Sequence, residues 1–199
     1  EQIANYDTLR ARAAAAGANL ASWRPDHRHA GGFRMSEIPM RLSFIANGIP
    51  RGQGNHRRNR HGATYETTKG HGLWRGAVIA AARAEMHDWE RRRPLEAGPS
   101  RVWTPIDSPS EVLIDFIFTR PESHYGTGRN SGILRDDAPP FPTSRRIGDI
   151  DKLVRTILDA LAAAEVIVDD QIVASLTAEK RWCLAGQAGV AVTVIRWAL

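Results

Sequence analysis

Residues 148–180 read GDIDKLVRTILDALAAAEVIVDDQIVASLTAEK, and this stretch decides how the chain folds. Apolar side chains recur along its first half at the spacing of one helix face, which predicts a helix over residues 151–163. These side chains are Ile150, Leu153, Val154, Ile157, Leu158 and Leu161. An Asp-Asp pair follows, and residues 172–181 then have the pattern of an extended segment. The chain is therefore expected to double back after the helix.

Alternating and helical patterns predict the remaining regular elements. Residues 111–119 (EVLIDFIFT) alternate apolar and polar side chains, and residues 40–47 and 190–197 read as further strands. Residues 73–93 have helical spacing and end at Pro94. The predicted fold class is α+β, with a small mixed or antiparallel sheet of about four strands packed against two main helices.

Two segments between these elements lack a regular pattern. Residues 51–63 (RGQGNHRRNRHGA) are expected to form a basic loop, and residues 120–146 a long irregular segment. A loop of that length in a small domain usually serves a function. Residues 1–36 are interpreted as an N-terminal extension or arm, and residues 37–199 as one domain that is long enough to bury a core.

Four carboxylates surround the best predicted helix. Asp149 and Asp151 lie at its start, and Asp169 and Asp170 follow it. The helix is about 18 Å long, and an extended return to residue 170 covers about 23 Å, so Asp170 is expected beside the first two. Carboxylates gathered in this way repel one another unless a cation neutralises them, and oxygen ligands alone favour Mg²⁺ or Mn²⁺. Two simpler interpretations stay open: an N-cap for Asp149 or Asp151, and a turn for the Asp-Asp pair.

A polar stripe runs along the same helix. Asp151, Arg155 and Asp159 are spaced four residues apart and therefore lie on one face. The stripe is consistent with an ion-pair ladder on the surface. It is equally consistent with an arginine that holds a phosphate one helical turn from a metal ion.

The charge of the chain is divided between two regions. The 199 residues carry a net charge of +5, and arginine supplies 24 of the 27 basic side chains. Residues 41–93 carry a net +7, whereas residues 148–199 carry a net −2. A nuclease needs both a positive surface for phosphates and a negative site for metal ions. The cations expected to contact DNA are Arg51, Arg57, Arg58, Arg60, Lys69, Arg145, Arg146, Lys152 and Lys180.

Several other classes of protein are excluded by composition. The sequence has no apolar run of 18 residues, so no membrane span is expected, and a cytoplasmic location is expected instead. Cys183 is the single cysteine, which excludes a disulfide framework and a cysteine-ligated zinc site. The Gly126-Thr127-Gly128 stretch is not followed by a predicted helix, which excludes a dinucleotide-binding fingerprint. No organic cofactor is expected.

The pattern of residues 148–180 resembles the signature of the RusA family of Holliday-junction resolvases. That signature has D-x-D at a helix start, a basic residue four positions on, then D-A-L, then D-D-x-x-V and a later lysine. Residues 120–130 (RPESHYGTGRN) also resemble a loop of phage-type members, and the resemblance extends over roughly residues 40–197. It implies that Asp149, Asp151 and Asp170 bind metal and that Arg155 is the basic catalytic residue, with Asp169 as an extra or supporting ligand.

The resemblance further implies an α+β homodimer that binds four-way DNA junctions in a bacterial cell or a phage-infected host. Members cut two strands symmetrically with Mg²⁺. Arg155 stands where a lysine is common; arginine keeps the charge but does not transfer a proton. Gly148 and Lys152 also depart from the usual Pro and Asn. Two alternatives remain: a Mg²⁺-dependent nuclease for other branched or flap substrates, and a DNA-binding protein without catalytic activity.

Overall fold

A computed structural model describes residues 40–54, 56–58, 60, 64–66, 68–92, 102–183 and 188–197. The predicted N-terminal extension, residues 1–36, lies outside this part of the chain. The main sheet consists of β1 (Arg41–Asn47), β4 (Ser110–Thr119), β5 (Val173–Cys183) and β6 (Gly189–Arg196). Their spatial order is β1-β6-β4-β5. β6 is antiparallel to both of its neighbours and β5 is parallel to β4, so the sheet is mixed, as predicted.

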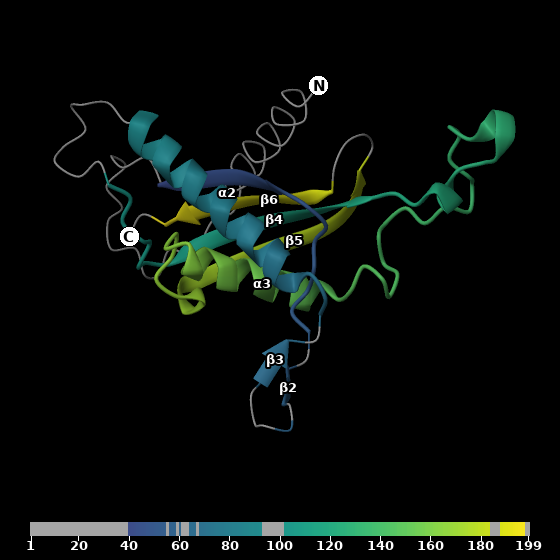
Figure 1. The fold of residues 1–199 in the computed structure, drawn as a ribbon. Helices are drawn as coiled ribbons and strands as arrows, with labels where there is room; N and C mark the ends of the chain where they lie inside the picture. The colour runs from purple at the N-terminus through teal and green to yellow at the C-terminus, as the bar shows by residue number, and fades with distance from the viewer. Residues whose placement is uncertain are drawn as a thin grey trace, which may run out of the picture.

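Two helices, α2 (His71–Arg92) and α3 (Ile150–Ala163), cover one face of this sheet (Figure 1). The predicted α+β fold is therefore confirmed. The two helices are tied together by side-chain bonds from α2 to the backbone of α3. The Arg75 guanidinium donates to the Asp159 carbonyl at 3.2 Å, and the Arg83 guanidinium donates to the Ala163 carbonyl at 3.1 Å.

The core lies between the sheet and the helices and follows the sequence patterns. Alternate residues of β4 are buried from Val112 to Phe118, as the alternation predicts. On α3, the side chains of Leu153, Ile157 and Leu161 are fully buried. Ile150 belongs to the same predicted stripe but is exposed at the edge of the core. The apolar stripe of α3 is therefore wider than the surface that the sheet covers.

β5 lies at the edge of the sheet and runs parallel to β4, and the chain reaches it through α3. Two parallel neighbours need a crossover connection, and a helix is its usual form. At the end of α3 the chain reverses through Glu165, whose φ of 66° is left-handed, and the Val166 amide donates to the Leu161 carbonyl at 3.0 Å. Ile167 then pairs with Ile106 in an isolated parallel bridge just ahead of β5.

The basic segment predicted as a loop contains a short hairpin. β2 (His56–Arg58) pairs antiparallel with β3 (Thr64–Glu66), and the hairpin projects from the body of the molecule (Figure 1). The loop interpretation of residues 51–63 was wrong in this part. Each strand is only three residues long, which is too short for the alternation of apolar and polar side chains from which strands are predicted.

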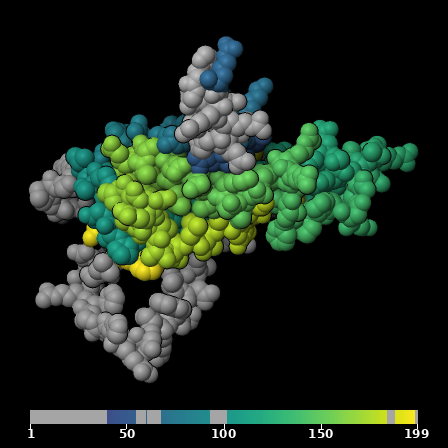
Figure 2. All heavy atoms as spheres, turned by 90° about the horizontal axis from the view of Figure 1, so that it is seen from below, coloured from purple at the N-terminus to yellow at the C-terminus, as the bar shows by residue number. Residues whose placement is uncertain are grey.

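A second projection is the irregular segment after β4. Residues 121–142, which we call the arm, extend beyond the end of the sheet and return to the start of α3 (Figures 1 and 2). The arm contains only the 3₁₀ turns η2 (Glu122–His124) and η3 (Gly128–Asn130) and a bridge between Tyr125 and Leu134. The long irregular segment predicted for residues 120–146 is thus confirmed.

Among the described residues, no helix is both long enough and apolar enough to cross a bilayer.

Candidate active site

Asp149 and Asp151 occupy different positions at the start of α3. Asp149 occupies the N-cap position, with extended backbone angles, but its side chain makes no capping hydrogen bond. Its carboxylate instead pairs with the Lys152 ammonium at 3.0 Å, and both side chains are exposed. Asp151 lies in the first turn of the helix and is also exposed. The simple capping interpretation therefore does not account for Asp149.

An open pocket lies between α3 and β5. Its volume is about 440 Å³. Three charged side chains line it: Asp151 and Arg155, one turn apart on α3, and Asp170 from the segment that leads into β5. The rest of the wall is apolar and consists of Ile150, Val154, Leu158, Leu176 and Ala178. The chain reversal after α3 thus brings Asp170 to the same pocket as Asp151 and Arg155.

The two members of the Asp-Asp pair have different environments. Asp169 precedes the 3₁₀ turn η4 (Asp170–Ile172), and its carboxylate accepts a hydrogen bond from the Gln171 amide at 3.0 Å. The turn interpretation therefore fits Asp169, which caps η4. Asp170 lines the pocket and is exposed.

The residue before Asp149 is held by β5. Gly148 has a φ of +86°, a conformation that residues with a side chain rarely adopt. Its carbonyl accepts a hydrogen bond from the half-buried Lys180 ammonium at 3.1 Å. Lys180 is two residues beyond Ala178 on β5, so both side chains lie on the pocket side of the strand. In this structure Lys180, expected from sequence to contact DNA, contacts the backbone at the entrance to α3.

A third segment crosses the first turn of α3, and sequence reasoning did not anticipate it. The Gln53 amide donates to the Lys152 carbonyl at 3.1 Å, and a Cβ at Gly52 would lie 2.9 Å from the Lys152 Cβ. The same carbonyl accepts from the Thr156 hydroxyl at 3.1 Å. The only sequence signal for this contact was a glycine within a basic stretch. The crossing brings half-buried Arg51, the residue before Gly52, close to the start of α3.

The electrostatic field at this end of α3 favours cations. A hydrogen bond and the charge of Asp149 raise the pKa of Lys152 above its usual value, and Asp151 contributes in the same direction. The cause is that carboxylates stabilise a nearby charged ammonium. A divalent cation at this end of the helix would be stabilised by the same carboxylates.

A comparison with models of protein families shows to which family the chain belongs. A family model described as "Endodeoxyribonuclease RusA" matches residues 47–195. The chain belongs to the RusA family. A search of curated proteins found no match. The matched residues contain α3, β5 and the arm, so the pocket and both of its walls lie within the RusA region. The chain is therefore assigned to a family of endodeoxyribonucleases, which are hydrolases of DNA.

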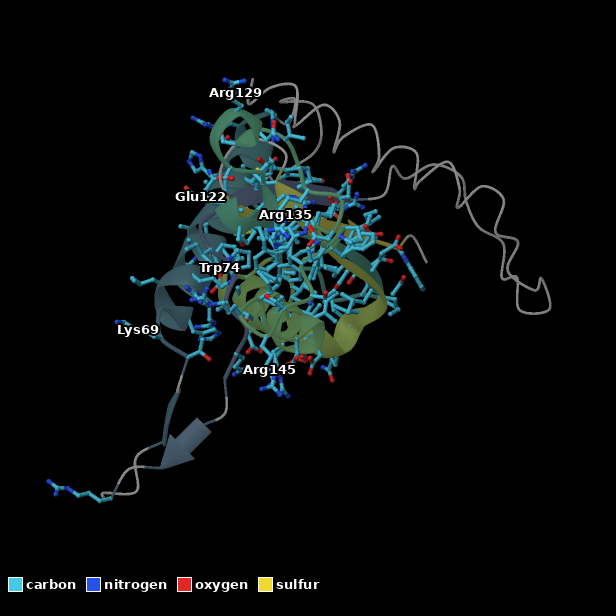
Figure 3. The ribbon with its side chains drawn as sticks, turned by 90° about the vertical axis from the view of Figure 1, so that its right-hand side faces the viewer. Lys69, Trp74, Glu122, Arg129, Arg135 and Arg145 are labelled. Carbon is cyan, nitrogen blue, oxygen red and sulfur yellow. The ribbon has the colours of Figure 1, made fainter. Side chains whose placement is uncertain are left out.

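The other cations expected to contact DNA are spread over the RusA domain. Arg145 and Arg146 are exposed on the approach to α3, and Lys69 is exposed ahead of α2, as Figure 3 shows for Arg145 and Lys69. Arg57 and Arg58 lie in β2, and exposed Arg60 follows that strand. None of these six residues lines the pocket between α3 and β5.

The donor set of the RusA pocket fits a hard divalent cation. No three His, Cys, Asp or Glu side chains within the described ranges are grouped closely enough to hold a metal ion by themselves. Mg²⁺ does not need such a cage, because it keeps several waters and binds through one or two carboxylates and substrate phosphates. Asp151 and Asp170 on one open pocket provide such a set, and Asp149 lies two residues from Asp151.

Proposed function

We propose that the protein is a Mg²⁺-dependent, structure-selective endodeoxyribonuclease that resolves four-way junctions by paired symmetric nicks. The observation that carries the proposal is the placement of Asp151, Asp170 and Arg155 around one open pocket in a RusA-family chain. Recombination, repair and phage DNA processing all produce such junctions as substrates.

The pocket residues have separate tasks in this proposal. Asp151 and Asp170, with Asp149 beside them, would hold Mg²⁺, which would activate water and offset the charge on the phosphate. Arg155 would bind the scissile phosphate through two parallel hydrogen bonds, which a planar guanidinium forms well. An arginine remains charged and does not donate a proton to the leaving oxygen, so its contribution is electrostatic. Because Arg155 lies one turn from Asp151, both can act on the same phosphate.

A homodimer is part of this proposal. A four-way junction has near two-fold symmetry and requires two cuts, whereas Asp151, Arg155 and Asp170 of one chain line the same pocket. A C₂ dimer supplies a second, symmetry-related pocket.

The test is cleavage of a synthetic four-way junction and of a linear duplex with matching sequence, each with Mg²⁺ and with EDTA. We expect cleavage of the junction alone, in Mg²⁺ alone. Asp151→Asn and Asp170→Asn should each reduce the rate at least about 100-fold, because the loss of one ligand impairs both water activation and charge neutralisation. Asp107→Asn is the matched control, because Asp107 is exposed and outside the pocket.

Three results would count against the proposal. Equal cutting of the duplex would exclude a junction resolvase, and preferential cutting of flaps would favour the alternative nuclease. Full activity of both Asp151→Asn and Asp170→Asn would show that the metal ion is not bound in this pocket. An Asp149→Asn variant with full activity would limit the ligands to the two carboxylates that line it.

A further inference from the structure

The arm is a preorganised projection and not a loose loop. Its two legs are joined by backbone bonds: the Gly126 amide donates to the Ile133 carbonyl at 2.9 Å, and the Arg135 amide donates to the His124 carbonyl at 3.0 Å. At Gly126 a Cβ would lie 2.7 Å from the Asn130 carbonyl oxygen, so the tip is packed tightly upon itself. A segment with this much internal bonding presents its outer side chains in fixed positions.

Trp182 of β5 holds the base of the arm. Its indole N–H donates to the Pro139 carbonyl at 3.0 Å, and the His124 ring meets the indole edge to face at 5.2 Å. The Arg120 guanidinium stacks over the same indole at 5.3 Å and donates to the Pro139 carbonyl. Trp182 follows Lys180 by two residues on the same face of β5. One strand therefore holds both the arm and the entrance to the catalytic helix, which fixes the arm relative to the pocket.

The outer part of the arm is exposed and carries little charge: its turn, residues 127–132, is small and polar, and two exposed apolar side chains follow it. Ile133 is 61 % exposed and its neighbour Leu134 is 45 % exposed. Arg129 is the single charged residue between positions 125 and 134, and Figure 3 shows its side chain pointing outward from the end of the arm. Arg135, the next cation along the chain, is bound bidentately by Asp137 within the arm. An apolar pair with one cation is poorly suited to gripping phosphates along a duplex.

The surroundings of the arm indicate DNA as the partner of its tip. The segment between the arm and α3 carries exposed Arg145 and Arg146, so cations that can bind phosphates lie along the chain between the arm and the catalytic helix. Figure 2 shows the arm projecting beyond the body at the end where it joins α3. A continuous duplex presents phosphates and groove edges, whereas a branch point also exposes apolar base faces where stacking ends.

We infer that the arm recognises the branch point itself: Ile133 and Leu134 contact the base faces exposed there, while Arg129 binds a neighbouring phosphate. The inference rests on the proposed function and deepens it, because it assigns the selectivity for branched DNA to a surface separate from the pocket. The pocket residues cut, and the arm determines which DNA is held there.

The test is the double variant Ile133→Ser, Leu134→Ser of the full chain. Binding of a four-way junction and of a linear duplex is measured by fluorescence anisotropy in EDTA, so that neither DNA is cut. Stacking of an aromatic side chain on a base is worth about 1–3 kcal/mol, and we expect two aliphatic side chains together to reach the lower part of that range. We therefore expect junction binding to weaken at least about tenfold, while duplex binding changes less than about twofold. Val102→Ser is the control, because Val102 is an apolar residue that is 70 % exposed and lies away from the arm. The next residue, Trp103, donates its indole N–H to the Glu165 carbonyl, just beyond the C-terminal end of α3.

The outcomes separate the inference from the function on which it rests. If the unaltered protein binds junction and duplex equally, the proposed function fails. If it prefers the junction and the double variant keeps that preference, the assignment of the arm is wrong. Sedimentation of both proteins tests the rival partner: a lower mass for the double variant would show that the tip contacts a second copy of the chain, which would also overturn the inference. The variant's melting temperature should be unchanged, because both side chains are exposed.

Discussion

Among single residues, Lys180 shows how the same charge can serve two different roles. Its ammonium donates to the Gly148 carbonyl at 3.1 Å, directly before Asp149, and it is half-buried beside the pocket. Sequence reasoning treated it as a DNA contact, since a lysine in a basic protein has no visible partner before the chain is folded. We therefore propose that Lys180 is a positioning residue, because it holds the backbone directly before Asp149.

We expect Lys180→Met to lower the rate of junction cleavage about tenfold at saturating protein, because small displacements of catalytic groups are costly. DNA affinity should change less than about twofold, and Lys180→Arg should restore part of the rate, since arginine also donates to carbonyls. Single-turnover cleavage and anisotropy measure the two effects. Weaker binding with an unchanged rate would instead support the original assignment to DNA contact.

Lys152 provides a second prediction, on metal affinity. Its ammonium forms an ion pair with the Asp149 carboxylate at 3.0 Å and thus competes with a metal cation for that carboxylate. The pKa of Lys152 is raised above its usual value of 10.5 in the folded protein. The charge that Lys152 brings to the ion pair is therefore fully present below pH 10.5, and it is lost only as the pH rises through the higher pKa of the folded state. The competition therefore operates throughout the neutral range.

We expect Lys152→Met to shift the Mg²⁺ concentration for half-maximal cleavage downward, by about two- to fivefold, because one competing charge is removed. A titration of cleavage rate against Mg²⁺ measures the shift. Lys69→Met is the control for net charge, because Lys69 is exposed and outside the pocket. An equal shift in both variants would assign the effect to overall charge and not to Asp149.

At the scale of elements, the segment before β2 is packed against the first turn of α3. This close packing predicts that a side chain at Gly52 destabilises the protein, and a second glycine, in α2, provides the comparison. Alanine at Gly52 would place its Cβ 2.9 Å from the Lys152 Cβ and 3.3 Å from the Lys152 backbone, so the crossing segment must move. We expect Gly52→Ala to lower the free energy of unfolding by about 1–3 kcal/mol, as overpacking does. Cleavage should fall as well, because the start of α3 moves with it.

Gly76→Ala is the opposite case. Gly76 is exposed within α2, and a Cβ there meets no atom within 4 Å. We expect the substitution to stabilise the protein by about 0.5–1 kcal/mol, because alanine loses less backbone freedom in a helix. Thermal or urea unfolding of both variants measures the contrast. Equal effects of the two substitutions would show that Gly52 is not held against α3.

The elements also show which parts of the fold are readable from sequence. The stripe of α3 and the alternation of β4 were predicted because burial against a sheet imposes a period on the chain. The β2–β3 hairpin left no such period, because each of its strands is three residues long. For the pocket, the spacing of Asp151, Arg155 and Asp170 indicated a common site, but its apolar wall was not anticipated. Ile150 and Leu158 looked like core residues, and only the position of β5 shows that they line the pocket.

In the molecule as a whole, three regions surround the substrate that we propose. The pocket lies between α3 and β5, the arm extends from that end of the sheet, and the hairpin projects on another side (Figure 1). The hairpin belongs to the region with a net charge of +7. This division predicts that affinity for DNA in general and preference for a junction belong to different projections and can be removed separately.

The double variant Arg57→Ala, Arg58→Ala tests whether the hairpin contributes general affinity for DNA and not preference for the junction. Contacts from cations to phosphates release counterions, so binding weakens with salt by a logarithmic slope of about 0.9 per phosphate. If both arginines bind phosphates, the double variant should lower that slope by about 2 and weaken junction and duplex binding equally. The preference for the junction should persist, because Ile133 and Leu134 are intact. Salt titrations by anisotropy measure both quantities. Loss of the preference with an unchanged slope would place recognition of the branch point in the hairpin and contradict the role assigned to the arm.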